Sequence, residues 1–514
     1  MASSIVLENG IVRTCAARGH TVSQLRIAGN RIGVPGHAAS PERVDLRGRC
    51  VVPGFSDSHV HFPTWSLVQR QIRLEDARSP EEVIARVASA ADGAPPGTWL
   101  RGYGWREGDW GEARITPALR ERFDRVTGDV PVILTSRDYH SVWVNAAGLA
   151  RADGDLTVPG GVVDRTPSGE PLGVLREAAA WTFRDNVARP SHQELLDATR
   201  DGIGRAHARG VTAVHDKDGW LGALRIWERL RAAGELGLRV WQSLPPDQLD
   251  DLASLGIASG FGDDWLAIGY IKMFQDGALG SGTALLADGS GVTITPPEQL
   301  REWVRRAAEL GFPVAIHAIG DRANQQVLDV LEDTRDAWAP RGLRQRIEHG
   351  QLLRREDVDR FAALGVTLSV QFSHVAMDRD IADDAWAGMT DRMYLFKTLQ
   401  EAGVRLCNGS DAPIDELDPL RGIRVAVQRS DDGRAAWHPE QRLSAEDALW
   451  ATTVNPAWLA RDEHRRGRLQ PDHLADLVVL DRDPVTCPPD ELEDAHVVAT
   501  MVDGVWMHNP PPWD

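Results

Sequence analysis

The chain has 514 residues, a formal net charge of -18, and a composition that is 42% hydrophobic and 26% charged. Its length exceeds one ordinary domain and suits a barrel of ~250 residues with additions, while its composition argues against wholesale disorder. The acidic balance argues against nucleic acid or an anionic membrane surface as a partner. We therefore expect a globular protein that acts on a small molecule.

Two further features of the sequence indicate where in the cell the protein acts. The first 20 residues lack a basic segment followed by an apolar one, and no later stretch approaches the roughly 18 apolar residues of a membrane span. The cysteines lie far apart without a CxxC pair, so neither a disulfide framework nor a thiolate zinc site is indicated; they are Cys15, Cys50, Cys407 and Cys487. We expect a cytoplasmic protein.

Both chain ends show short apolar runs separated by turn residues. Asn9-Gly10 and Gly29-Asn30 interrupt the runs near the N-terminus, and Asp503-Gly504 does so near the C-terminus. Such dipeptides between apolar runs predict strand-turn-strand units. Residues 1–53 and 455–514 are therefore predicted to build one composite β-sandwich, with a catalytic domain of residues 54–454 between them.

The middle of the chain contains eight short apolar runs, most of them followed by an amphipathic helical stretch. Strands that alternate with helices predict a parallel sheet, and eight such units predict an α/β fold of the (β/α)8 TIM-barrel type. The runs cover residues 51–61, 210–216, 238–244, 268–274, 313–321, 346–350, 366–372 and 404–411.

About 140 residues separate the first run from the second, which is far more than a βα connection needs. We therefore predict an insertion at about 65–200 with structure of its own. It emerges at the C-terminal face of the barrel, where barrel active sites lie. Its tryptophans either line a substrate pocket or pack the core of the insertion; they are Trp65, Trp99, Trp105, Trp110, Trp143 and Trp181.

Residues able to bind a metal stand at the ends of five of the eight runs. His59 and His61 are two apart, so on a strand both side chains point to one face. Alone, each later candidate has an ordinary structural explanation, such as a hydrogen-bonded histidine or a turn aspartate. A barrel brings all these strand ends together, and the nitrogen and oxygen donors suit zinc and related ions. The candidates are His59, His61, Lys272, His317, His349 and Asp411.

The segments SDSHVHF, IKMFQDGALGSGTALL, IHAIGDRA, RIEHG and NGSDAPIDELDPL resemble the amidohydrolase superfamily. More narrowly, they are similar to its family 3, which includes the YtcJ-like proteins and the N-substituted formamide deformylases. The resemblance extends over nearly the whole chain, including GRLQPDHLADLVVLDRDP near the end.

The resemblance implies a binuclear centre. His59, His61 and Asp411 would hold the first ion, His317 and His349 the second, and carbamylated Lys272 would bridge both. The ions are expected to be two zinc ions, with manganese, iron or nickel as alternatives.

The resemblance also implies hydrolysis of a carbon–nitrogen bond in an amide, an N-formyl or N-acyl amine, or a cyclic amide, by metal-activated hydroxide. Asp411 would be the general acid/base. The expected substrate contacts are His140, Trp143, Gly282 and Asp276, where Gly282 replaces the arginine that the family commonly has. A homodimer is the default expectation.

Further histidines and two other functions stay open. His215 and Asp216 could orient metal ligands from behind, and His374 stands just beyond the seventh strand. A mononuclear deaminase would share most of the ligand set, but its HxxE pattern is absent, because Gly320 occupies the glutamate position after His317. A non-catalytic homologue would show eroded ligands, and none of the six positions is eroded.

Overall fold

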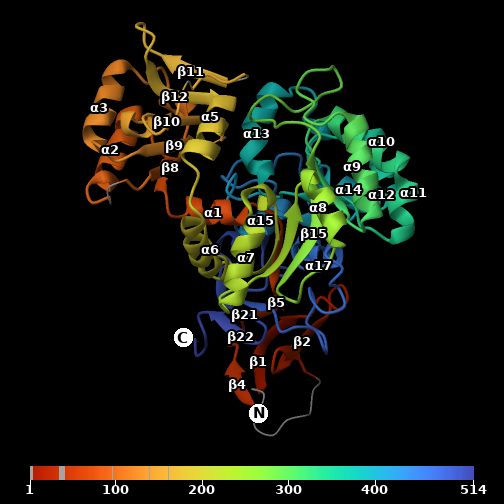
Figure 1. Cartoon of the computed structure of the whole chain (residues 1–514). Helices are drawn as coiled ribbons and strands as arrows, with labels where there is room; N and C mark the ends of the chain where they lie inside the picture. Colours follow the sequence, from red (N-terminus) through yellow and green to blue (C-terminus); the bar gives the residue numbers. More distant parts are fainter. Residues whose placement is uncertain are drawn as a thin grey trace. The chain divides into compact units, whose positions relative to one another are not determined.

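The computed structural model describes residues 4–33, 41–94, 97–137, 139–154, 156–159 and 161–513. The chain divides into two compact units, Met1–Trp65 with Thr199–Asp514, and Ser66–Ala198 (Figure 1). The second unit coincides with the stretch expected as an insertion at about 65–200. Over the described ranges, no helix has the length and apolar character needed to cross a membrane.

The first unit contains the predicted parallel barrel, and all eight predicted strands are present. In hydrogen-bonding order they run β19-β18-β17-β16-β15-β14-β13-β6, and each strand is parallel to its neighbours. The backbone of Asp411 donates to His59 O and that of His61 to Ala412 O, which joins the two end strands. The strands are β6 (Phe55–Val60), β13 (Val211–Asp216), β14 (Arg239–Leu244), β15 (Leu266–Phe274), β16 (Val314–Ala318), β17 (Arg346–His349), β18 (Thr367–Val370) and β19 (Leu406–Asn408).

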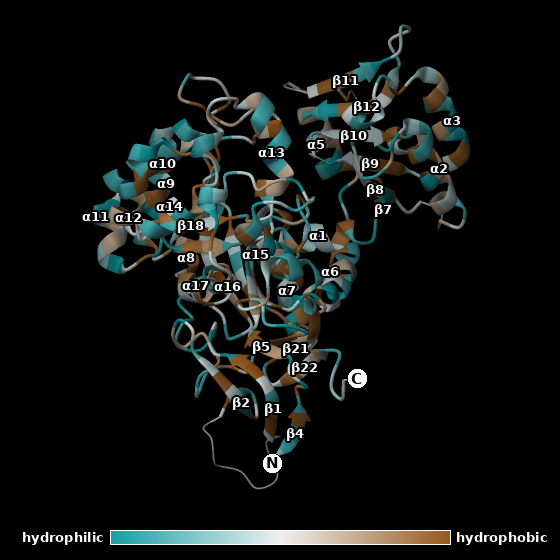
Figure 2. Ribbon diagram, turned by 180° about the vertical axis from the view of Figure 1, so that it is seen from behind, coloured by the Kyte–Doolittle hydropathy of each residue, from teal (hydrophilic) through white to brown (hydrophobic). Residues whose placement is uncertain are grey.

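Helices follow the barrel strands and bury one apolar stripe each. In α10 the buried Ala323, Val327 and Leu331 recur every four residues, which places them on one face. In Figure 2, helix α9 (Pro297–Glu309) is coloured mainly as hydrophilic, whereas strand β5 (Cys50–Pro53) is coloured as hydrophobic. Two helices, α1 (Phe62–Val68) and α6 (His192–His207), span the boundaries between the two units. The other helices of the first unit are α7 (Ala223–Ala232), α8 (Leu249–Leu255), α9 (Pro297–Glu309), α10 (Asp321–Asp333), α11 (Arg335–Trp338), α12 (Val358–Leu364), α13 (His374–Ala385), α14 (Phe396–Glu401), α15 (Pro419–Gln428), α16 (Ala445–Thr452) and α17 (Val454–Leu459).

The two chain ends form one small β domain, as predicted, but its strands make a single hydrogen-bonded path, β22-β21-β20-β5-β1-β2-β3, with β4 paired to β1. The turns at Gly29-Asn30 and Asp503-Gly504 are confirmed. The turn predicted at Asn9-Gly10 is wrong: β1 continues through it as a bulge, where Asn9 has a φ of 60° and the register with β2 shifts. The strands are β1 (Ser4–Arg13), β2 (Thr21–Ala28), β3 (Arg31–Ile32), β4 (Glu42–Asp45), β5 (Cys50–Pro53), β20 (Leu477–Leu480), β21 (Val497–Val502) and β22 (Val505–His508).

The second unit is a six-stranded mixed sheet with its own core. Its order is β11-β12-β10-β9-β8-β7. Trp105, Trp110 and Trp143 belong to its buried core together with Phe123. Its main elements are β7 (Ile72–Arg73), α2 (Pro80–Ala91), β8 (Leu100–Trp105), α3 (Pro117–Thr127), β9 (Val132–Ser136), β10 (Ser141–Val144), α4 (Ala146–Leu149), β11 (Gly161–Arg165), β12 (Pro171–Glu177) and α5 (Ala178–Thr182).

Candidate metal centre

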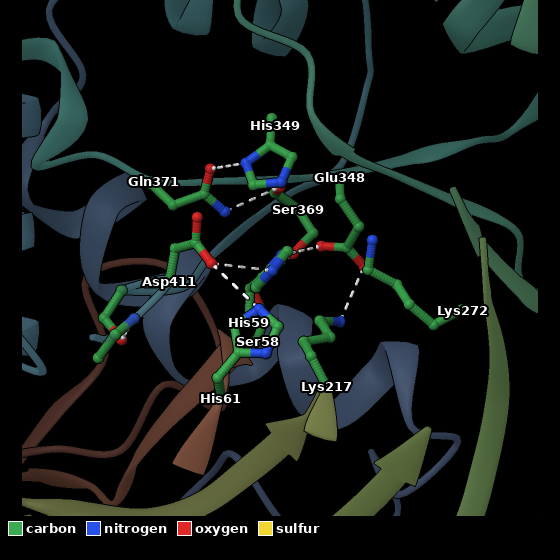
Figure 3. A network of polar contacts seen from close by, with 12 residues as sticks. Ser58, His59, His61, Lys217, Lys272, Glu348, His349, Ser369, Gln371 and Asp411 are labelled. Carbon is green, nitrogen blue, oxygen red and sulfur yellow. Dashed lines mark hydrogen bonds and ion pairs between the residues drawn. The ribbon is translucent and has the colours of Figure 1, made fainter. Parts of the chain in front are cut away.

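Three of the predicted ligands meet at the closure of the barrel. His59 lies in β6 and His61 just after it, with one residue between them, while Asp411 follows β19. Asp411 Oδ1 lies 3.2 Å from His59 Nε2 and 3.6 Å from His61 Nε2. One donor atom from each residue falls within 4.8 Å of the others, so the three could coordinate one ion. Figure 3 shows this group.

The backbone around this group explains why Asp411 reaches the histidines. A Cβ at Gly409 would lie 2.5 Å from the amide nitrogen of His59, so only glycine permits this approach. The buried carboxylate of Asp57 accepts hydrogen bonds from the backbone of His59 at 2.9 Å and of Ser410 at 3.1 Å. These contacts tie β6 to the segment that carries Asp411.

Three histidines have their Nδ1 atoms engaged by side-chain oxygens. Nδ1 of His59 lies 2.7 Å from Glu348, that of His61 lies 2.8 Å from Asp218, and that of His349 lies 2.8 Å from Gln371. An acceptor at Nδ1 places the ring proton there and leaves Nε2 with a free lone pair. All three rings are thereby prepared to coordinate through Nε2.

A second set of candidates lies beside the first. The rings of His317 and His349 are 4.4 Å apart between centroids, and His349 lies 4.8 Å from His59. His317 Nε2 lies 2.9 Å from the carbonyl oxygen of Gly277, so this nitrogen donates and Nδ1 keeps the lone pair. Burial lowers the pKa of His317 to about 3 and that of His349 well below its usual value, so both rings are neutral, as a ligand must be.

Lys272 is buried without an ion pair among the described residues. It is 1% exposed, its Nζ donates to the carbonyl of Met273 at 3.3 Å, and it lies 3.7 Å from the centroid of the Phe274 ring. Burial lowers the pKa of Lys272 to about 8, although Glu348 and Asp411 act in the opposite direction. The amine is therefore much easier to deprotonate than an ordinary lysine.

Lysine is rare in this chain, which has three lysines among its 57 lysines and arginines. Two of the three, Lys217 and Lys272, are buried around the ligands, and the third is Lys397. Arginine could supply the charge but cannot lose its proton in a protein. A neutral amine, which arginine cannot supply, would explain a lysine at position 272.

The carboxyl group of Asp411 is held in its ionised form. Its burial would raise the pKa, but interactions with His59, His349 and His61 keep the pKa of Asp411 well below its usual range. Burial lowers the pKa of His59, so its ring is neutral. For His61 the contact with Asp218 outweighs burial and raises the pKa. The group thus combines an anionic oxygen donor with imidazole nitrogens, which fits a divalent ion.

A network of buried charged side chains contacts the candidate ligand His59. Its members were not among the residues predicted from the sequence. The carboxylate of Glu348 contacts His59 with Oε2, while Oε1 accepts from Lys217 Nζ at 2.9 Å and forms an ion pair with Arg346 Nε at the same distance. Lys217 also donates to Tyr270 Oη at 2.9 Å. The sequence signal was adjacency: Glu348 immediately precedes His349, and Lys217 immediately follows Asp216.

Two residues at the end of β13 orient this region. His215 Nδ1 accepts from Arg346 at 2.9 Å, so His215 contacts the charge network and not a ligand. Asp216 accepts from the backbone of Phe62 and Asp218 and from Trp227 Nε1. It therefore fixes the turn that presents Asp218 to His61.

The residues expected to contact substrate belong to both units, two to each. His140 is in the second unit, where its Nδ1 lies 2.8 Å from Glu177 Oε2. Trp143 is fully buried, with Phe123 at 4.7 Å between ring centroids, which favours the packing alternative. The buried carboxylate of Asp276 accepts from three backbone amides and so organises its loop. Gly282 has a φ of +66° and open space where a side chain would begin.

Comparison with known proteins decides the family. Residues 42–508 match the model described as the Amidohydrolase family. The chain belongs to the amidohydrolase family. As a member, it is a metal-dependent hydrolase that acts on carbon–nitrogen bonds, and the predicted resemblance and fold class are confirmed.

Individual relatives of this amidohydrolase agree in length and fold. It is 30% identical to the putative amidohydrolase YtcJ of Bacillus subtilis, covering 90% of each chain. It is 28% identical to an N-substituted formamide deformylase of Arthrobacter pascens, covering 98% of this chain and 97% of that one. An uncharacterized metal-dependent hydrolase from Pyrococcus horikoshii superposes with a TM-score of 0.80 at 28% identity, covering 95% and 99%.

Proposed function

We propose that this amidohydrolase uses two divalent ions, zinc in the first instance, to hydrolyse an N-formyl or other N-acyl amine. The observation that carries the proposal is the buried Lys272, which has no ion pair among the described residues and acts on both His317 and His349. His59, His61 and Asp411 would hold one ion, and His317 and His349 the other. Two ions are proposed because these five protein ligands exceed the usual four around one zinc. A carbamate on Lys272 would add a donor group to each set.

Carbamylation has a balanced and simple chemistry. The neutral Nζ of Lys272 adds to the carbon of CO2 and loses one proton, which leaves an anionic carbamate with two oxygen donors. A pKa near 8 gives roughly a tenth of the amine in neutral form at pH 7, compared with well under one part in a thousand at an ordinary value. The change gives the site one negative charge and two oxygen donors, both of which favour binding of divalent cations.

The chain's own groups then move the proton. Bound ions supply Lewis acidity, which polarises a carbonyl and lowers the pKa of water toward ~7. The ionised carboxylate of Asp411 is placed to accept the proton of the attacking water and to return it to the departing nitrogen. Glu348 and Asp218 keep the rings of His59 and His61 in one orientation throughout.

The substrate class rests on the deformylase relative, which covers nearly the whole chain. N-formyl amines are therefore the first class to assay, followed by N-acetyl amines and cyclic amides. His140 is proposed as a substrate contact.

The test uses the scarcity of lysine. Zinc-loaded protein prepared with ¹³C-labelled bicarbonate should give a carbamate carbon resonance and about two zinc ions per chain. Lys272→Ala should abolish the resonance, lose most metal and formamide hydrolysis, and regain part of the activity with formate or acetate. Lys397→Ala, which alters an exposed lysine, is the matched control and should resemble the parent. One zinc ion with full activity in Lys272→Ala would overturn the proposal.

A further inference from the structure

A buried histidine near the candidate centre has no partner. His374 is the first residue of α13 and is 2% exposed. Among the described residues, neither of its ring nitrogens has a hydrogen-bond partner. An imidazole buried without partners costs roughly 1–3 kcal/mol, so such a residue calls for an explanation other than stability.

Two carboxyl groups lie around this histidine. Asp378 is one helical turn further along α13, on the same face. Burial raises the pKa of Asp378, and the nearby His374 opposes this. Burial would also raise the pKa of Asp415, but Arg421 and His374 bring it below its usual value. We call His374, Asp378 and Asp415 the His374 cluster.

The two carboxyl groups differ in what they already bind. A carboxylate oxygen of Asp378 accepts from the hydroxyl of Tyr394. Asp415 Oδ1 accepts from Arg421 at 2.6 Å, whereas its Oδ2 is buried and has no partner among the described residues. The cluster therefore presents one unused carboxylate oxygen together with both nitrogens of His374.

The cluster adjoins the candidate centre. Gln371, which holds His349, stands three residues before His374, and Asp415 stands four residues after Asp411. Asp411 also acts on the pKa of Asp378, after burial, His374, the hydrogen bond from Tyr394 and Asp415 as larger causes. The unused polar atoms therefore follow the carboxyl ends of β18 and β19, on the face of the barrel where barrel active sites lie.

We propose that the His374 cluster is a subsite that binds a protonated amine of the substrate. It carries two carboxyl groups, and among the described residues only that of Asp415 is paired with an arginine, so its charge favours a cation and disfavours a carboxylate. An ammonium group has three N–H donors. Two of them would be accepted by Asp415 Oδ2 and by the unprotonated ring nitrogen of His374. This inference deepens the proposed function, on which it rests, by assigning a cationic substituent to the substrate.

Binding is tested separately from catalysis. n-Butylammonium, 1-butanol and butanoate, which have equal length and different charge, are titrated into the zinc-loaded full-length protein and followed by ligand NMR. The parent should bind n-butylammonium most tightly of the three. His374→Phe and Asp415→Asn should each raise its dissociation constant by about tenfold or more, which is about 1.4 kcal/mol, and change that of 1-butanol by less than about twofold.

A stability measurement distinguishes a ligand contact from a packing role. If His374 serves a ligand, His374→Phe should leave the thermal midpoint unchanged or raise it, because an unpartnered polar group is replaced by an apolar one. His207→Asn is the matched control, since His207 is equally buried but bonds the carbonyl of Gly237. It should lower the midpoint without affecting amine binding.

The outcomes separate the two proposals. Parent-like binding of n-butylammonium in His374→Phe, or a parent that binds butanoate better or binds no amine, overturns the subsite. Intact amine binding with no hydrolysis of N-(4-aminobutyl)formamide, N-pentylformamide or 4-formamidobutanoate overturns the proposed function and leaves the subsite supported. If both hold, kcat/KM should favour the aminobutyl compound, and His374→Phe should remove that preference chiefly through KM.

Discussion

The substitution Glu348→Gln removes the only carboxylate that contacts Lys217, Arg346 and His59 together within the described structure. Glu348 and Lys217 have fully buried side chains, and that of Arg346 is 2% exposed. The amide has nearly the same size, so the change removes charge rather than volume. The buried side chains of Lys217 and Arg346 are then left without their carboxylate partner, and His59 loses its carboxylate acceptor.

The expected loss can be worked out from these contacts. Removing one partner of a buried ion pair costs about 3–5 kcal/mol. The unit that contains the barrel has about 380 residues, which at roughly 2.1 cal/mol/K per residue corresponds to an unfolding entropy of about 0.8 kcal/mol/K. The midpoint of its thermal unfolding should fall by about 4–6 °C. Zinc affinity should fall about 10- to 100-fold, because the orientation of His59 is weakened.

Calorimetry of the metal-free protein measures the midpoint without a contribution from bound zinc, and a competing chelator measures the zinc affinity. Adding Lys217→Met to Glu348→Gln should recover part of the lost midpoint, since one unpaired cation is removed, but not the zinc affinity. Glu332→Gln, which alters an exposed partner of Arg360, should shift the midpoint by less than about 1 °C. A parent-like midpoint together with parent-like zinc affinity in Glu348→Gln would refute the reasoning.

Three further outcomes are expected. Asp411→Asn should lower kcat by about 100-fold or more in a steady-state assay, because the amide cannot accept the proton; an unchanged pH profile would exclude Asp411 as the base. Trp143→Ala should destabilise the second unit by about 3–5 kcal/mol in denaturant unfolding, with parent zinc content, because it opens a cavity. Carbamate labelling of metal-free protein at constant dissolved CO2 should rise with pH through about 8, since the lowered pKa of Lys272 makes the neutral amine predominate above it and disappear below it; a midpoint near 10.5 would contradict this.

The apolar runs of the sequence predict the barrel, and the polar residues at their ends predict the candidate ligands His59, His61 and Asp411. Strands buried on both faces are continuous apolar runs, so their number and order are visible in the chain, and the polar residues that interrupt their ends stand out. The bulge at Asn9-Gly10 shows the limit of such reasoning. The same dipeptide suits a turn or a bulge, and the pairing of β1 with β2 on both sides of it decides between them.

Which polar groups already have hydrogen-bond partners becomes visible only in the folded chain. Glu348 and Lys217 have no distinctive spacing from His59, yet folding brings residues from β6, β13 and β17 into one hydrogen-bonded network. The sequence likewise left Trp143 and Asp276 as substrate contacts, whereas the structure engages one in packing and the other with backbone amides. His374 was an isolated histidine in the sequence and became a candidate ligand-binding residue because burial left both of its nitrogens unused. Hydrogen-bond satisfaction depends on neighbours that are distant in the chain, and a one-dimensional pattern does not contain them.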